Sequence, residues 1–160
     1  MGSPTAKRSD GFTLIELLVV LAVLGILAVT VFPLAEITVQ RERERELKRA
    51  LWEIRDGIDA YKRASDRGAI TPPANSSGYP PSLATLAKGV ASAKAGGQTV
   101  YFLRRVPRDP FADESLADEA TWALRSYASS PQKPQAGGDV FDVASQSEKI
   151  GLNGIPLKQW

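Results

Sequence analysis

Glu16 is the residue whose type and position most clearly imply chemistry. It is a carboxylate at the start of a long apolar run, in the sequence Gly11-Phe12-Thr13-Leu14-Ile15-Glu16. The nineteen residues from Leu17 to Ala35 carry no charge. An ionised side chain inside hydrocarbon is costly, so such a carboxylate is expected to be functional and to need a partner. The alternative is a glutamate that is simply solvated at the level of the lipid headgroups.

The apolar run is about as long as a membrane-spanning helix, which needs roughly 20 residues. Lys7 and Arg8 precede it and favour a cytoplasmic N-terminus, so the rest of the chain is expected outside. A cleaved secretory leader is less consistent, because its apolar region has only about 7–15 residues and ends in a small-x-small site. The sequence therefore predicts a transmembrane segment over 12–37.

The stretch from Gly11 to Leu18 resembles the N-terminus of the type IV prepilins and type II secretion pseudopilins. In these families a short basic leader ends in glycine and is followed by Phe-Thr-Leu-Ile-Glu. The resemblance implies cleavage between Gly11 and Phe12 by a prepilin peptidase on the cytoplasmic face, with N-methylation of Phe12. It thus makes residues 1–11 a leader and leaves the span in the mature chain.

After such cleavage, the nearest partner for Glu16 is the new amine at Phe12, one helical turn away. The amine of the same chain or of a neighbouring subunit can neutralise the carboxylate, and the family resemblance favours the neighbour. Pro33 interrupts the apolar helix, so we expect a kink or a locally melted turn near Thr30–Pro33. In pilin-like families a proline at this place is associated with local unwinding, which makes Pro33 an expected hinge.

Beyond the apolar run, residues 38–65 are predicted to continue the same helix as an amphipathic segment. Apolar residues recur at steps of four and three, which indicates one buried face. Residues 41–46 alternate in charge and are read as a solvated stretch with i,i+3 pairs such as Arg41/Glu44 and Glu42/Arg45. The apolar stripe comprises Leu47, Leu51, Ile54, Ile58 and Tyr61.

Residues 66–160 are predicted to form a small globular head. Residues 80–87 have the pattern of a short helix opened by proline, with Leu83 and Leu86 facing a core. Residues 122–127 and 139–143 have the aromatic and β-branched content of strands. The predicted fold class is therefore α+β and type IV pilin-like: a long N-terminal helix packed on a small antiparallel sheet.

The head resembles the major pseudopilins of type II secretion in the order of its elements: Gly78–Pro81, Val106–Pro110, Asp139–Val143 and Trp160. Major pseudopilins usually carry an acidic C-terminal loop that binds calcium. Here the matching stretch, 145–154, has little acid, and Lys149 lies within it. We expect a metal-free loop closed by Trp160. If calcium binds instead, its candidate ligands are Asp142, Ser145, Ser147, Glu148 and Asn153.

Composition excludes several classes of function. The chain has no Cys and no His, so it offers no disulfide, thiolate nucleophile or imidazole base. It contains neither a Gly-x-Ser-x-Gly elbow nor a glycine-rich phosphate loop, which argues against an enzyme. A formal net charge of +2 is small for a nucleic-acid-binding protein.

These observations together predict a structural subunit of a type II secretion pseudopilus, with its N-terminus in the cytoplasm and its head in the periplasm. Its expected partners are copies of itself, other pseudopilins, a prepilin peptidase and an inner-membrane assembly platform. Two alternatives remain open: a type IV or DNA-uptake pilin, and a signal-anchored periplasmic domain that never polymerises.

Overall fold

The computed structural model describes residues 11–74, 76–94 and 96–160, with the side chains of 29–35 left out. Its contacts divide the chain into one unit that ends at Val39 and a second unit from Gln40 to Trp160. A single helix, α1 (Leu14–Asp66), contributes to both units. The leader residues 1–10, including Lys7 and Arg8, lie outside the described part.

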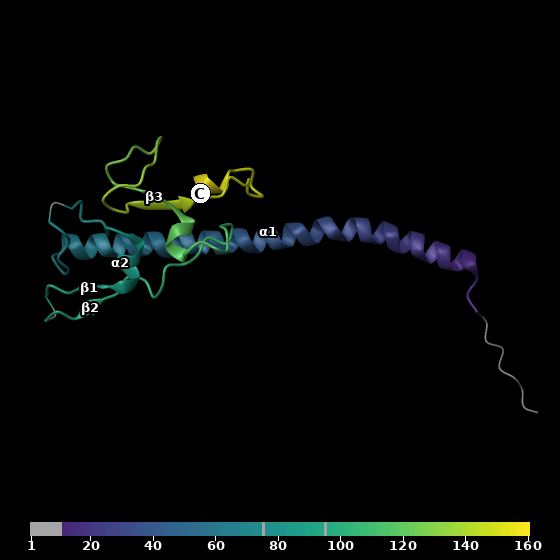
Figure 1. Cartoon of the computed structure of the whole chain (residues 1–160), viewed down its shortest axis with the longest axis horizontal. Helices are drawn as coiled ribbons and strands as arrows, with labels where there is room; N and C mark the ends of the chain where they lie inside the picture. Colours follow the sequence, from purple (N-terminus) through teal and green to yellow (C-terminus); the bar gives the residue numbers. More distant parts are fainter. Residues whose placement is uncertain (1–10, 75, 95) are drawn as a thin grey trace, which may run out of the picture. The chain divides into compact units, whose positions relative to one another are not determined.

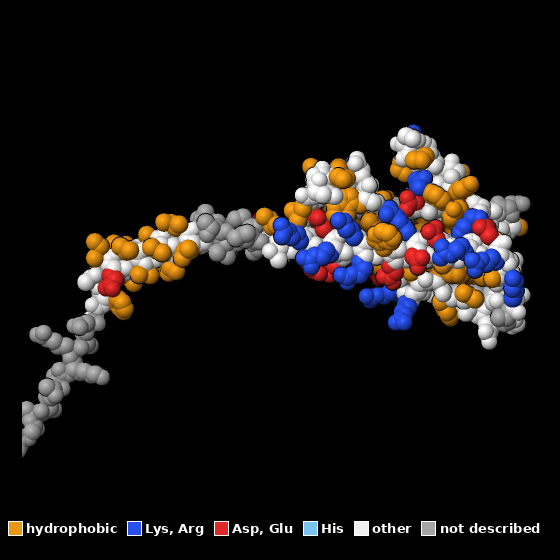
Figure 2. Space-filling view, turned by 180° about the vertical axis from the view of Figure 1, so that it is seen from behind, with side chains coloured by type: hydrophobic (Ala, Val, Ile, Leu, Met, Phe, Trp, Pro, Cys, Tyr) orange, Lys and Arg blue, Asp and Glu red, His pale blue; other side chains and the backbone are white. Residues whose placement is uncertain are grey.

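The first unit presents apolar side chains without covering them. Every large apolar side chain from Leu14 to Leu27 is exposed, and Figure 2 shows hydrophobic groups over the visible face of this stretch. Within the described residues, no helix has a window both long and apolar enough to count as a membrane span. The apolar run that predicts a span at 12–37 includes residues 29–35, whose side chains lie outside the described set.

The core of the second unit is built on one face of α1. Leu47, Ile54 and Tyr61 are fully buried there, as the apolar stripe predicts. Burial raises the pKa of the Tyr61 hydroxyl, which has no hydrogen-bond partner among the described residues. The core also includes Leu51, Ile58, Ile70, Leu83, Leu86, Leu103, Val106, Trp122, Val140, Val143 and Leu157.

The predicted short helix is present as α2 (Leu83–Lys88), with Leu83 and Leu86 in the core. Ser82 caps it, since its Oγ accepts a hydrogen bond from the Thr85 amide at 3.3 Å. Gly89 ends it with a φ of 78°, a conformation that favours glycine. The helix begins at Leu83, later than the predicted 80–87, because Ser82 and not Pro80 caps it.

The described head contains two small antiparallel sheets, where one was predicted. β1 (Val90–Ala91) pairs with β2 (Thr99–Val100), and β3 (Trp122–Arg125) pairs with β4 (Asp142–Ser145). In Figure 1, β3 lies on one side of the part of α1 that belongs to the second unit, and α2 lies with β1 and β2 on the other side. The fold is thus α+β and pilin-like, a long N-terminal helix packed against small antiparallel sheets.

The second strand was predicted at 139–143, but the observed strand β4 begins three residues later, at Asp142. Val140 donates its amide to the Pro80 carbonyl at 2.8 Å, so it is bonded away from the sheet, and β4 begins only at Asp142. The β1–β2 pair was not predicted, because residues 68–98 have the Gly, Pro, Ser and Ala content of a loop.

The charged run 41–46 is a second point of difference. The Arg45–Glu42 pair forms, with 2.9 Å between nitrogen and oxygen. Glu44, by contrast, is only 8% exposed and accepts a hydrogen bond from the Leu152 amide at 2.8 Å. The predicted Arg41/Glu44 pair does not form because Glu44 faces the C-terminal segment of the head.

Candidate processing and assembly site

The expected cleavage site lies in exposed, non-helical chain just ahead of α1. Residues Gly11 to Thr13 have no regular structure, and Phe12 is 84% exposed. Thr13 caps the helix, because its Oγ1 accepts a hydrogen bond from the Glu16 amide at 3.3 Å. The Gly11–Phe12 peptide bond is therefore in a segment that an extended peptide-binding cleft can reach without unwinding the helix.

Glu16 is exposed in the first turn of α1. A carboxylate is favoured there by the partial positive charge of the helix N-terminus. Glu16 has no ion-pair partner among the described residues. With the Gly11–Phe12 bond intact, the Phe12 nitrogen is an amide and carries no charge, so the predicted amine partner can exist only after cleavage.

α1 is continuous through Thr30–Pro33, so the backbone described here has no melted turn at this place. A helix tolerates a proline at the loss of one backbone hydrogen bond. The side chains of 29–35 lie outside the described residues, and the hinge role of Pro33 stays a prediction.

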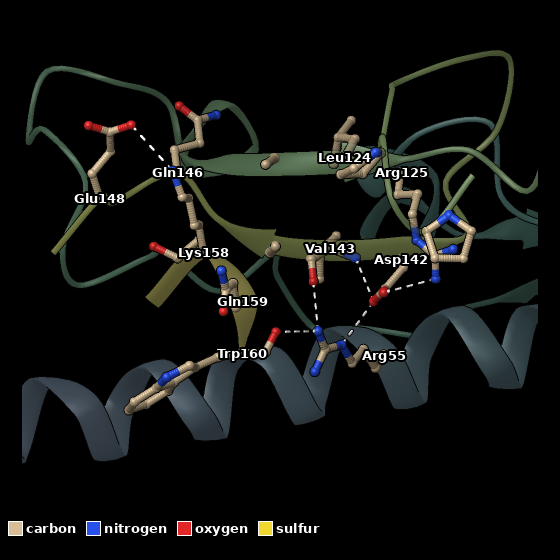
Figure 3. Close-up of a pocket in the computed structure, with 15 residues that line it drawn as sticks. Arg55, Leu124, Arg125, Asp142, Val143, Gln146, Glu148, Lys158, Gln159 and Trp160 are labelled. Atoms are coloured by element: carbon tan, nitrogen blue, oxygen red, sulfur yellow. Dashed lines mark hydrogen bonds and ion pairs between the residues drawn. The ribbon is translucent and has the colours of Figure 1, made fainter. Parts of the chain in front are cut away.

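A C-terminal strap, defined here as residues 146–160, is fastened to α1 by Arg55. Its guanidinium donates to Asp142 Oδ1 at 2.9 Å, to the Val143 carbonyl at 2.9 Å and to the Trp160 carbonyl at 2.8 Å (Figure 3). Arg125 adds a second ion pair to Asp142 at 3.2 Å. One helix residue thus joins β4 to the end of the strap.

Arg55, Arg125 and Asp142 line one part of a cavity of about 570 Å³ over the β3–β4 sheet. Glu148 and Lys158 lie at the other end of the view in Figure 3, paired at 3.4 Å. The charged groups of this cavity therefore largely satisfy one another.

Each candidate calcium ligand is engaged within the protein. Ser145 donates to Asp109 Oδ2 at 2.5 Å, and Ser147 Oγ accepts from the Lys149 amide at 3.3 Å. Asn153 Oδ1 accepts from the Ile155 amide at 3.0 Å. Of the five candidates, Asp142, Ser145 and Glu148 line the cavity, whereas Ser147 and Asn153 do not. Across the described residues, no group of three or more acidic, His or Cys side chains is placed to hold a metal ion.

The strap is closed in part by the predicted packing of Trp160. Its ring is partly buried against the core, with the Lys48 ammonium 4.6 Å from the ring centroid. A Cβ added at Gly151 would lie 2.6 Å from the Trp160 ring, so this close approach requires glycine. The indole Nε1 is buried without a hydrogen-bond partner among the described residues.

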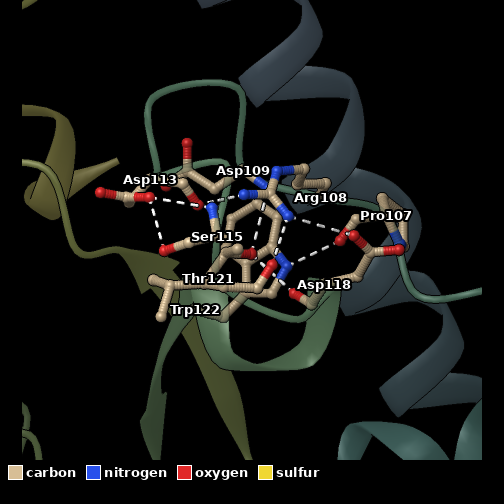
Figure 4. Close-up of polar contacts among 9 residues, drawn as sticks. Pro107, Arg108, Asp109, Asp113, Ser115, Asp118, Thr121 and Trp122 are labelled. Atoms are coloured by element: carbon tan, nitrogen blue, oxygen red, sulfur yellow. Dashed lines mark hydrogen bonds and ion pairs between the residues drawn. The ribbon is translucent and has the colours of Figure 1, made fainter.

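The Pro107–Pro110 turn is held to the sheet by Asp109, which is 1% exposed. Asp109 accepts the bond from Ser145 and another from the Phe111 amide at 2.8 Å. Trp122 donates its indole N–H to the Pro107 carbonyl at 2.8 Å (Figure 4). The turn thereby locks both strands of the β3–β4 sheet.

The neighbouring acidic loop is exposed and folded on itself, as Figure 4 also shows. Ser115 donates its amide at 2.8 Å and its hydroxyl at 2.7 Å to Asp113 Oδ1, and these bonds lower the pKa of that carboxyl. Arg108 reaches Asp118 at 3.4 Å and also bonds the Asp113 carbonyl.

Asp139 organises the loops that meet at the end of the β3–β4 sheet. Its carboxylate accepts from the Ser77 hydroxyl, from the Ser126 hydroxyl at 2.8 Å and from the Tyr127 amide at 2.9 Å. Burial opposes ionisation of this group, but the three hydrogen bonds outweigh it and lower the pKa of Asp139. Tyr127 stacks beside it on Tyr79, with 5.4 Å between ring centroids.

Glu44, Arg55 and Asp109 position the head, and sequence reasoning did not identify them. Each one acts on a residue more than 30 positions away in the chain. The only local signal is that Glu44 and Arg55 fall at the edges of the apolar stripe of α1, where a long polar side chain can reach over the core boundary.

The family model described as "Prokaryotic N-terminal methylation motif" matches residues 6–32. No curated protein and no solved structure matches the chain. The matched range includes the expected cleavage site, Glu16 and most of the apolar run. The chain is thus a prepilin-like protein that carries the N-terminal methylation motif of the type IV pilin and pseudopilin superfamily.

Proposed function

We propose that this chain is a structural subunit of a type II secretion pseudopilus, cut between Gly11 and Phe12, methylated on Phe12 and polymerised in the periplasm. The observation that carries the proposal is the methylation motif at residues 6–32, which coincides with an exposed, non-helical Gly11–Phe12 bond directly ahead of a 53-residue helix. A precursor of this kind needs an accessible bond for cleavage at the membrane boundary. It also needs a long helix through which the cleaved subunits pack against one another.

The exposed apolar side chains of α1 support membrane storage followed by helix packing. A surface that is apolar over residues 14–27 is stable only in lipid or against other apolar surfaces. A subunit of this kind is held in the inner membrane before assembly, and its helix packs against other helices afterwards. The second units, each consisting of the head and the part of α1 from Gln40 onward, then cover the outside of the fibre.

Glu16 supplies the register of that packing. In the cleaved chain, the Phe12 amine of an incoming subunit is positively charged and pairs with the carboxylate of its neighbour. An unpaired carboxylate in hydrocarbon costs several kcal/mol by order of magnitude. Registers that leave Glu16 unpaired are therefore disfavoured relative to the one that pairs it.

The order of elements in the head supports the secretion system over a true pilus. The Tyr79-Pro80 turn, the Pro107–Pro110 turn and a C-terminal strap that ends in a packed Trp160 succeed one another as they do in major pseudopilins. In this system, growth of the fibre moves cargo, and no catalytic residue is required of the subunit.

The test is electron microscopy of cells that overproduce the chain with a type II secretion assembly machinery. We expect fibres that label with an antibody against the head. Fibres formed only with a type IV pilus machinery would instead assign the chain to a pilus. Correct insertion with no fibres under either machinery would identify a non-polymerising anchor and reject the proposal.

A further inference from the structure

Six exposed charged residues of α1 just beyond Gln40 fall into a basic and an acidic set, while Arg43 and Arg49, also exposed, lie on either side of the acidic set. At about 100° per residue, Arg41, Arg45 and Lys48 fall on one side of the buried stripe, and Glu42, Glu46 and Glu53 fall on the other. All six are exposed. We name these sets the basic face and the acidic face. Lys/Arg and Asp/Glu side chains both gather on the visible surface of the head in Figure 2.

Two charges on each face are not consumed by ion pairs within the described residues. Arg45 and Glu42, three residues apart at the adjoining edges of the two faces, pair with each other. Arg41 and Lys48 on the basic face, and Glu46 and Glu53 on the acidic face, make no such pair. Lys48 lies over the Trp160 ring, which leaves its charge uncompensated.

The basic face also carries Trp52, which is 76% exposed. It lies one helical turn beyond Lys48 and helps to line a hollow of about 250 Å³ with Leu51 and Trp160. An exposed tryptophan beside unpaired cations is typical of a contact surface, since this side chain provides a large rigid anchor. We therefore interpret the basic face as a binding surface for a partner and not as a solvated surface.

The spacing of the free charges is the same on both faces. Arg41 and Lys48 are seven residues apart, as are Glu46 and Glu53, and seven residues rise about 10.5 Å along a helix. Two parallel helices displaced by five residues, about 7.5 Å, place Arg41 opposite Glu46 and Lys48 opposite Glu53 simultaneously. With this displacement, Trp52 falls between Asp56 and Ala60 of the neighbour, where the alanine leaves room for an indole.

We propose that the partner of the basic face is the acidic face of a second copy of this chain, in parallel and displaced by about 7.5 Å along the helix. This inference rests on the proposed fibre and names the contact that sets its periplasmic register. The free charges of the two faces, Arg41 with Lys48 and Glu46 with Glu53, are about 140° apart around α1, so these charges cannot meet through a two-fold axis. A contact between different surfaces repeats from copy to copy and builds an open array.

A lipid surface is the competing partner for a basic face with a tryptophan. It would engage Arg41, Lys48 and Trp52 and leave the acidic face without a role. The matched spacing of Glu46 and Glu53 favours a second copy, because only that partner uses both faces. Each ion pair is individually weak at the surface, so the pairs act mainly on register and selectivity.

Charge reversal of the full-length chain, produced with its assembly machinery, tests the contact. Arg41→Glu with Lys48→Glu makes both faces acidic, and Glu46→Lys with Glu53→Lys makes both basic. We expect each double variant alone to lower the fibre yield at least tenfold. The matched controls, Arg104→Glu with Arg105→Glu and Glu114→Lys with Glu119→Lys, change charge equally at exposed head positions and should keep the wild-type yield.

Producing the two double variants together in one cell is the decisive experiment. Co-production of the two double variants pairs an acidic surface with a basic one at every contact, so fibres should return and contain the two chains in alternation. The fourfold variant with exchanged faces should also assemble. If the acidic-face variant assembles normally and only the basic-face variant fails, the partner is a membrane surface and the proposal is overturned.

Disulfide trapping tests the register directly, because the chain has no cysteine of its own. Copies with Lys48→Cys and copies with Glu53→Cys, assembled together, should form a disulfide-linked dimer of the two. The matched pair Lys48→Cys and Arg43→Cys should not. Wild-type fibres with neither crosslink nor sensitivity to reversal would reject this contact alone, whereas absence of wild-type fibres would reject the proposed function beneath it.

Discussion

At the scale of single residues, the account depends on Glu16 in the first turn of α1 and on the chain just before it. Thr13 caps the helix, so Gly11 and Phe12 remain outside it and exposed. Cleavage there creates an amine one turn from the carboxylate. The same short segment thus provides a cut site and a charge that needs a partner.

Glu16→Ala should insert into the membrane at least as well as the wild type, because it removes a charge that is expensive in hydrocarbon. It should assemble poorly, because the incoming Phe12 amine loses its partner. Membrane fractionation and fibre yield measure the two effects separately. Glu16→Asp, which keeps the charge, should retain more assembly than Glu16→Ala, and wild-type fibre yield in Glu16→Ala would contradict this role.

At the scale of elements, the head is held together by long polar contacts between α1, the β3–β4 sheet and the strap. Glu44 binds the Leu152 amide and the Gln40 side chain, at 2.8 and 2.9 Å. Arg55 binds β4 and Trp160. These contacts connect parts of the chain that share no local pattern.

Glu44→Ala should lower the free energy of unfolding of the dissociated chain in detergent by about 1–3 kcal/mol, because it leaves a backbone amide of the strap without its acceptor. Glu46→Ala is the matched control, since Glu46 is exposed and the change should stay within about 0.5 kcal/mol. Denaturant titration of both variants compares them. Equal stabilities of the two variants would show that the Glu44–Leu152 hydrogen bond does not stabilise the head.

Asp139 predicts a dependence of stability on pH. Its pKa is lowered in the folded state, so its contribution is complete above the unfolded-state pKa of about 3.9 and is lost as pH falls through the lower folded value. The drop in urea midpoint between pH 6 and pH 3 should be smaller in Asp139→Asn than in the wild type. Glu114→Gln is the matched exposed control. The same drop in all three proteins would exclude this contribution.

Local patterns were sufficient for the two α-helices and for β3, which lies within the predicted strand 122–127, but not for β4 or the β1–β2 pair. The period of the apolar stripe predicted the buried face of α1, and the opening proline with Leu83 and Leu86 predicted the short helix that forms α2. Val140 has the pattern of a strand residue but donates its amide to Pro80, a partner 60 residues away. Glu44 looks solvated within its charged run, and only the folded strap gives it a partner. A single sequence carries no direct signal for such contacts.

At the scale of the whole molecule, a subunit of this kind must hold its head together without disulfides, because the chain has no cysteine. Packing of the strap and its polar contacts provides the closure. The candidate calcium ligands already bond within the protein, through Asp109, Arg55 and the strap backbone. We therefore expect the head to be stable without added metal.

Chelation should leave the melting temperature of the full chain nearly unchanged. Trp160→Ala should lower it by several degrees, because truncation of a large, partly buried ring costs about 3 kcal/mol, the lower end of the range for tryptophan. Thermal melts with and without a calcium chelator compare the two effects. A large drop on chelation would restore a calcium site at Asp142, Ser145, Ser147, Glu148 and Asn153.

The central claim is that the Gly11–Phe12 bond is cut and the new N-terminus is methylated. Intact-mass spectrometry of the chain extracted from membranes of cells with a prepilin peptidase measures this most directly. The account predicts a mass lacking Met1–Gly11 and carrying one added methyl group on Phe12. It also predicts an uncut Gly11→Leu variant, because a side chain at the scissile bond obstructs close approach of the peptidase. A wild-type chain that retains Met1–Gly11 in the presence of the peptidase would contradict the account.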